Sequence, residues 1–62
     1  MIYSFIKCRN GLAAVSKAKK QGAKPIAYAS NGFMGSYWVF ETFEELGEWK
    51  TRQSGNPNVE FI

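Results

Sequence analysis

The stretch PIAYASNGFMGSYWVFE, residues 25–41, decides the fold. Both of its ends are rich in β-branched and aromatic residues, which favour strands. Between them stands Asn31-Gly32, the strongest two-residue signal for a hairpin turn, because both residues tolerate a positive φ. We therefore predict a β-hairpin with strands over residues 25–30 and 33–41.

The hairpin determines which side chains share a face of the sheet. A two-residue loop would place Ser30 opposite Phe33 and Tyr28 opposite Gly35. Successive side chains of a strand point to opposite faces, so the pairing predicts two distinct sets. One face takes Ala27, Ala29, Met34, Ser36, Trp38 and Phe40, and the other takes Ile26, Tyr28, Phe33, Gly35, Tyr37, Val39 and Glu41.

Upstream of the hairpin, the sequence predicts a strand and then a helix. Residues 2–8 are mostly β-branched and aromatic, and Asn10-Gly11 ends the run. Residues 11–21 are rich in alanine and lysine, with Asn10 placed to cap the first turn and Gly22 to end the last. The predicted apolar stripe of this helix consists mostly of small side chains: Leu12, Ala14, Val15 and Ala18.

Downstream of the hairpin, a second helix begins at a capping-box pattern, Thr42-Phe43-Glu44-Glu45. Phe43, Leu46 and Trp49 recur at intervals of three and should share its buried flank. Residues 54–58 read Ser-Gly-Asn-Pro-Asn and stop the helix, and residues 59–62 predict a last short strand.

These elements follow one another as β-α-β-β-α-β. We expect a single compact α+β domain over residues 1–62, with an antiparallel or mixed sheet and both helices on one face, as in a ferredoxin-like or split βαβ plait. The alternative is a three-stranded sheet with two helices. A chain of 62 residues buries only about 60% of the surface that its unfolded form exposes.

The composition excludes most chemistry. The chain has no histidine, its five acidic residues are all glutamates, and Cys8 is its one cysteine. The usual ligand sets for metals and the usual nucleophile–base pairs are therefore missing, and we expect no metal, no cofactor and no catalysis. A single cysteine forms no internal disulfide, and no run approaches about 18 apolar residues, so we expect a cytoplasmic protein without a membrane partner.

The candidate binding surface is the sheet face without helices. Small Ala27 and Ala29 leave room for Trp38 and Phe40 under the helices, whereas Glu41 on the other face should meet water. The bare face would present four aromatic anchors, and the alternative reverses the two faces. The predicted anchors are Tyr28, Phe33 and Tyr37, with Tyr3 from the first strand.

Two functions suit such a surface. The first is a non-catalytic protein-binding module, an adaptor or inhibitor that acts by stoichiometric occlusion of a macromolecular partner. As a size class, the chain resembles the accessory proteins by which bacteriophages inhibit host enzymes or defence systems. The same face could also pair two copies of the chain as a homodimer.

The second function is RNA or DNA binding. The net charge is +3, and sheet-based binders stack bases on aromatic side chains beside a basic rim. Under either function, lysines would steer a partner electrostatically. The predicted electrostatic residues are Lys17, Lys19, Lys20 and Lys24.

Overall fold

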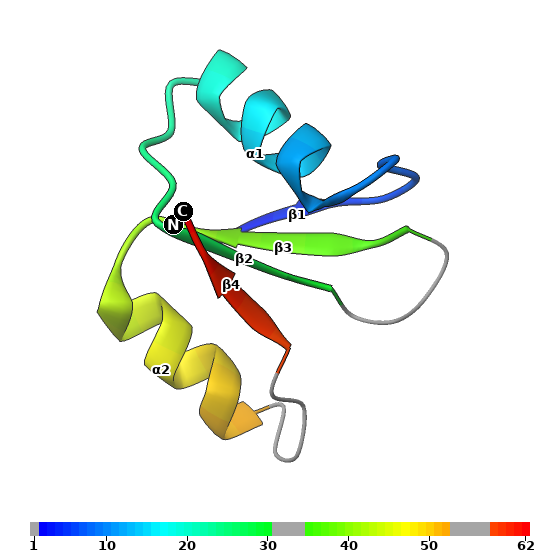
Figure 1. Ribbon diagram of the computed structural model, residues 1–62. Coiled ribbons are helices and arrows are strands. Elements are labelled where there is room, and N and C mark those ends of the chain that lie inside the picture. The colour runs from blue at the N-terminus through cyan, green and yellow to red at the C-terminus, as the bar shows by residue number, and fades with distance from the viewer. Residues whose placement is uncertain (1, 31–34, 53–57) are drawn as a thin grey trace.

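The computed structural model describes residues 2–30, 35–52 and 58–62. Four antiparallel strands form one sheet in the order β1-β3-β2-β4, and two helices complete a small α+β domain (Figure 1). The three-stranded alternative is therefore wrong. In chain order the elements are β1 (Tyr3–Phe5), α1 (Gly11–Lys20), β2 (Ala27–Ser30), β3 (Tyr37–Phe40), α2 (Phe43–Arg52) and β4 (Val59–Phe61).

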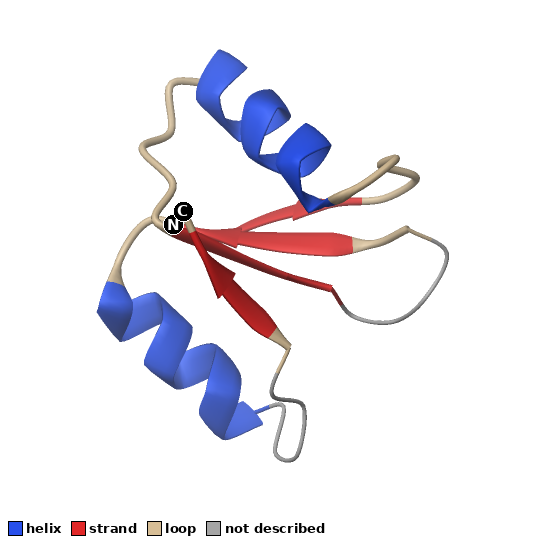
Figure 2. Ribbon diagram, viewed as in Figure 1, coloured by secondary structure: helices blue, strands red, loops and turns tan. Residues whose placement is uncertain are grey.

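The two helices lie on opposite faces of the sheet (Figure 2), so the prediction of both helices on one face is wrong. On one face, Ala14, Val15 and Ala18 of α1 form a buried cluster with Val39 of β3. On the other face, α2 supplies the buried helical side chains of a second cluster. This second cluster consists of Leu46 and Trp49 of α2 with Ala27, Ala29 and Phe40 of the sheet.

Strand order explains this arrangement. Helix α1 connects β1 to β2 across β3, and helix α2 connects β3 to β4 across β2. Strands β1 and β3 run in opposite directions, and both connections move across the sheet toward β4. Such crossover connections are almost always right-handed. Two right-handed connections that move the same way but start from strands of opposite direction must place their helices on opposite faces of the sheet.

A ferredoxin-like plait is therefore not what forms. In that plait the last strand returns beside the first, the second connection moves backward, and both helices share a face. Here β4 lies beside β2 instead. The sheet becomes the middle layer of three, and the ferredoxin-like prediction is corrected on this point.

The hairpin keeps its predicted faces although its predicted pairing is wrong. Ser30 pairs with Tyr37, four positions beyond the expected Phe33. Because a shift of four is even, the side chains of β2 and β3 stay on their predicted faces. Ile26, just before β2, was predicted on the Tyr28 face but packs against the α2 cluster instead. Asn31-Gly32, Phe33 and Met34 lie outside the described residues. The α2 face receives Ala27, Ala29, Trp38 and Phe40, and the α1 face receives Tyr28, Tyr37 and Val39.

The helix ends confirm the local predictions. Asn10 Oδ1 accepts a hydrogen bond from the Ala13 amide at 2.9 Å, which caps α1. Gly22 has a φ of 89°, and the Ala23 amide donates to the Ala18 carbonyl at 3.0 Å, the bond that closes a Schellman motif. At the start of α2, Thr42 Oγ1 accepts from the Glu45 amide at 3.2 Å, as a capping box requires.

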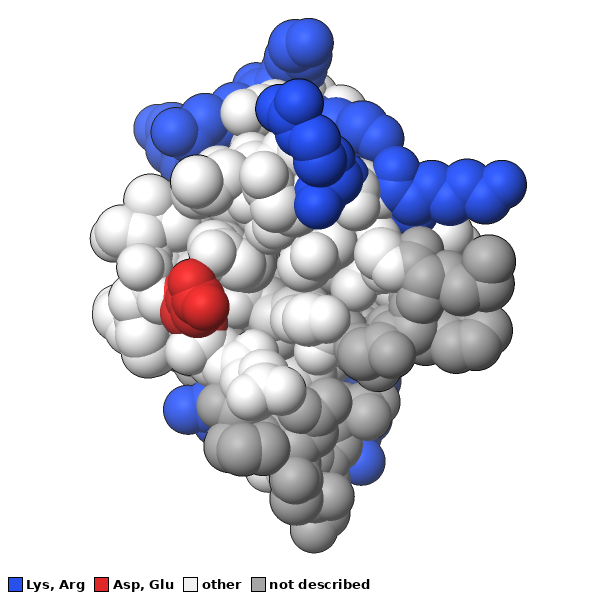
Figure 3. Space-filling view, turned by 45° about the vertical axis from the view of Figure 1, so that its right-hand side comes forward, with Lys and Arg blue, Asp and Glu red and all other residues white. Residues whose placement is uncertain are grey.

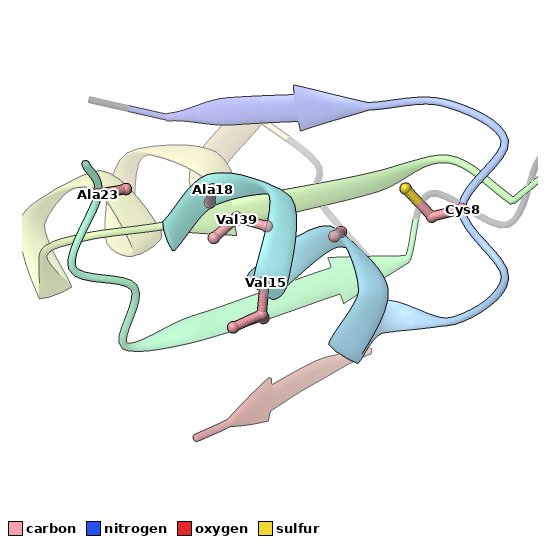
Figure 4. Close-up of a cluster of buried hydrophobic side chains, with 6 residues drawn as sticks. Cys8, Val15, Ala18, Ala23 and Val39 are labelled. Carbon is pink, nitrogen blue, oxygen red and sulfur yellow. The ribbon is translucent and has the colours of Figure 1, made fainter. Parts of the chain in front are cut away.

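Two predicted core residues lie on the surface instead. The buried flank of α1 begins at Gly11 and continues through Ala14, so Leu12 points away and is 61% exposed. In α2 the predicted flank buries Leu46 but leaves Phe43, the first helical residue, 71% exposed. Cys8 joins the α1 core, and Figure 4 shows it at the opposite end of the cluster from Ala23.

Candidate functional site

The predicted aromatic surface is covered in part by α1. Tyr3, Tyr28 and Tyr37 lie on the expected face, but all three are half-buried and pack against the α1 cluster. The prediction that this face is bare is wrong, because α1 packs over part of it. Phe33, the fourth predicted anchor, lies outside the described residues.

A groove remains on this face, between the start of α1 and β4. Its volume is about 520 Å³. The structure brings Tyr28 and Tyr37 together along it, whereas Tyr3 lies on β1 and does not line it. The sequence reasoning missed its other members because they come from segments distant in sequence. The described residues that line it are Asn10, Gly11, Tyr28, Ser30, Tyr37, Asn58, Val59 and Glu60.

Contacts on three sides hold the Tyr28 ring in place within the groove. The ring lies so close to Gly11 that any side chain there would overlap it. Its hydroxyl donates to Glu60 Oε2 at 2.6 Å. The Tyr37 ring meets it edge-on, with centroids 6.4 Å apart and planes at 68°. The groove therefore presents aromatic surface and a carboxylate in a defined arrangement.

The Glu60 carboxylate also changes the pKa of the Tyr28 hydroxyl. The hydrogen bond to Glu60 raises the pKa of Tyr28 above its ordinary value of 10.0, and burial and the Glu60 charge act in the same direction. At neutral pH the phenol keeps its proton and donates it in the hydrogen bond to the Glu60 carboxylate.

Charge is segregated along the chain. Residues 1–40 hold six basic and no acidic side chains, a formal +6, and residues 41–62 hold two basic and five acidic ones, a formal −3. These two values give the net charge of +3. Figure 3 shows basic side chains gathered over one end of the molecule. The four predicted electrostatic residues, Lys17, Lys19, Lys20 and Lys24, are all exposed.

A second aromatic surface lies on the α2 face, and sequence reasoning missed it. Phe43 and Phe61 are 71% and 58% exposed, and their ring centroids are 6.2 Å apart. We call them the Phe43–Phe61 pair. They meet because β4 pairs with β2 and brings Phe61 next to the first residue of α2. No local sequence pattern predicts that β4 pairs with β2.

The Phe43–Phe61 pair lies at β4, the last strand in the order of the sheet. The Ile62 amide donates to the Ile26 carbonyl at 2.9 Å, and Tyr28 pairs with Glu60 in the same register. Backbone groups alternate between the two sides of an antiparallel strand, so those of Val59 and Phe61 point away from β2. This end of the sheet therefore offers both backbone hydrogen bonds and apolar surface.

Two further kinds of feature, a metal-ligand cluster and a membrane-spanning helix, were sought among the residues that the structure describes. Its residues hold no group of three side chains suited to a metal ion. Neither α1 nor α2 has the length and apolar character that crossing a membrane requires.

No family model, curated protein or solved structure gives a significant match to this chain. The function is therefore inferred from three features: the groove, the basic segment of residues 1–40, and the Phe43–Phe61 pair.

Proposed function

We propose that this chain is a small non-catalytic protein-binding module that occludes a macromolecular partner stoichiometrically, as an adaptor or inhibitor. The observation that carries the proposal is the Phe43–Phe61 pair, two large aromatic side chains in contact and mostly exposed. Exposed aromatic clusters often mark interaction sites, and phenylalanine is enriched in interfaces. Tyr28 and Tyr37, which were predicted to bind the partner, belong to the groove and not to this surface.

The edge of β4 supports one docking mode, the addition of a partner strand. An extended segment of the partner would bond to the outward backbone groups of Val59 and Phe61, and an apolar side chain would rest on the Phe43–Phe61 pair. Glu44, in the first turn of α2, makes the surroundings acidic. A protein segment with neutral or basic flanks suits this edge, whereas a phosphate backbone does not.

We also propose that the protein acts in the cytoplasm, as expected of a phage-type accessory protein that targets a host enzyme or defence system. A cytoplasmic setting suits Cys8, which is a free thiol in the α1 core.

The test compares serine substitutions of three large, mostly exposed apolar side chains. Immobilised wild type, Phe43→Ser, Phe61→Ser and the control Leu12→Ser are exposed to host lysate with and without nuclease. We expect wild type and the control to retain one protein regardless of nuclease. With the purified partner, calorimetry should give a 1:1 complex that either phenylalanine substitution weakens about 10-fold or more. Equal binding by all four proteins would contradict the proposal.

Nucleic-acid binding is the second candidate function, and the charge segregation favours it. Residues 1–40 carry a formal +6 without an acidic residue, and their exposed lysines on and after α1 suit phosphates. Since each phosphate contact releases counterions, such a complex weakens steeply with salt, whereas the apolar contact on β4 does not. Titration with salt therefore separates the two functions.

A further inference from the structure

We infer that the groove between α1 and β4 receives one unpaired base of a single-stranded nucleic acid, preferably guanine, while the α1 lysines bind the neighbouring phosphates. This inference rests on the second candidate function. It is carried by the groove, where Tyr37, Tyr28 and the Glu60 carboxylate follow one another across β3, β2 and β4 on the α1 face.

The groove has the size and surface for a base. Its volume of about 520 Å³ falls within the range of small-molecule sites. Tyr28 and Tyr37 line it, and proteins hold unpaired bases by stacking them on such rings. The contacts of Tyr28 with Gly11, Glu60 and Tyr37 hold its ring in place before a ligand arrives, which reduces the ordering cost of binding.

Glu60 indicates which base fits. Its side chain lies on the α1 face, where it accepts the Tyr28 hydroxyl. An ionised carboxylate only accepts hydrogen bonds and has about four acceptor positions, so the bond from Tyr28 leaves capacity for a ligand. Guanine presents two adjacent N–H donors on its Watson–Crick edge, which match the two oxygens of a carboxylate. The corresponding edges of adenine, cytosine and uracil each lack two adjacent N–H donors.

The charges assign the rest of the ligand. A carboxylate in the groove repels phosphate, so the groove suits a base and not the backbone. Lys17, Lys19 and Lys20 are exposed on α1 outside the groove lining. A strand with one base in the groove would therefore place its phosphates toward the helix, where these cations attract them.

The experiment measures fluorescence anisotropy of labelled uridine heptamers that carry guanosine, adenosine, cytidine or uridine at the centre, in about 50 mM salt. We expect the guanosine heptamer to bind about 10-fold more tightly than the uridine heptamer. Glu60→Gln keeps the size of the side chain but leaves one acceptor oxygen, and it should abolish this preference. Binding of the uridine heptamer should change less than about 2-fold, because the lysines remain.

Two further variants separate stacking from general effects on the fold. Tyr37→Leu should weaken all four heptamers about 10-fold, since it removes a stacking ring. Tyr3→Leu is the matched control, because Tyr3 is a half-buried tyrosine on the same sheet face outside the groove. Circular dichroism checks that each variant is folded. If Tyr37→Leu unfolds, Glu60→Gln still tests the inference, because Glu60 is exposed and its substitution should leave the fold intact.

The outcomes distinguish failure of the inference from failure of the function. If Lys19→Gln with Lys20→Gln weakens every heptamer while Glu60→Gln changes no base preference, the protein binds nucleic acid but the groove holds no base. If wild type binds no heptamer, both the function and the inference are overturned. Capture of a protein that Glu60→Gln and Tyr37→Leu abolish, without heptamer binding, would assign the groove to a protein ligand instead.

Discussion

At the scale of single residues, Gly11 connects the helix to the groove. It is the first residue of α1, and its lack of a side chain lets the Tyr28 ring lie against the helix. The sequence indicates a break between strand and helix at this position. The close approach of Tyr28 becomes visible only when β2 is placed under α1. Gly47 in α2 is the opposite case, because a side chain there would meet nothing within 4 Å.

Alanine at these two glycines should act in opposite directions. Gly11→Ala should lower the free energy of unfolding by about 1–3 kcal/mol, because the methyl group displaces the Tyr28 ring. Gly47→Ala should raise it by about 0.5–1 kcal/mol, because alanine restricts the unfolded chain and favours helix. Urea unfolding of both variants measures the difference. A Gly11→Ala variant as stable as wild type would show that Tyr28 does not contact the helix.

At the scale of elements, each helix buries a narrower stripe than its apolar pattern suggests. Leu46 and Trp49 of α2 are each 3% exposed, whereas Phe43 lies on the surface beside Phe61. Spacing by three residues puts side chains on one flank of a helix, but the length of the sheet beneath decides how many are covered. Phe43, at the very start of α2, lies beside Phe61 of β4 and stays exposed.

Alanine substitutions along this flank should therefore differ in cost. Leu46→Ala should lower the free energy of unfolding by about 2–5 kcal/mol, because it opens a cavity in the α2 core. Phe43→Ala should change it by less than about 0.5 kcal/mol, since the ring is mostly in water. Equilibrium unfolding in urea compares them, and similar losses would mean that Phe43 belongs to the core.

At the scale of the whole molecule, the sheet separates two small cores. Val39 and Phe40 are neighbours in β3 and both fully buried, yet Val39 belongs to the α1 core and Phe40 to the α2 core. The same layering separates the charges, because the basic segment includes α1 and most of the glutamates lie around α2. The molecule therefore has two chemically different sides.

Double-mutant cycles should detect this separation. Val15→Ala and Trp49→Phe lie in different cores, so their effects on the free energy of unfolding should add within about 0.3–0.5 kcal/mol. Phe40→Leu and Trp49→Phe disturb rings in contact, with centroids 5.4 Å apart, and should deviate from additivity by about 0.5 kcal/mol or more. Strong coupling between Val15 and Trp49 would indicate one shared core.

Part of the candidate site follows from the sequence. Strand alternation places Tyr28 and Tyr37 on one face, and exposure of the α1 lysines follows from their charge. Glu60, Asn10 and the Phe43–Phe61 pair do not follow from it. Their importance depends on β4 lying beside β2, and residues 59–61 carry no signal for that neighbour.

What the sequence alone determined is local: the helix caps, the strands, and the division of hairpin side chains between two faces. Hydrogen bonds and backbone preferences within a few residues decide these features, so they are readable without the fold. The tertiary structure alone decided the position of β4, and through it the opposite placement of the helices, the groove and the exposed Phe43–Phe61 pair. Pairing between strands distant in sequence depends on how the whole chain buries its apolar surface, and no short segment contains that information.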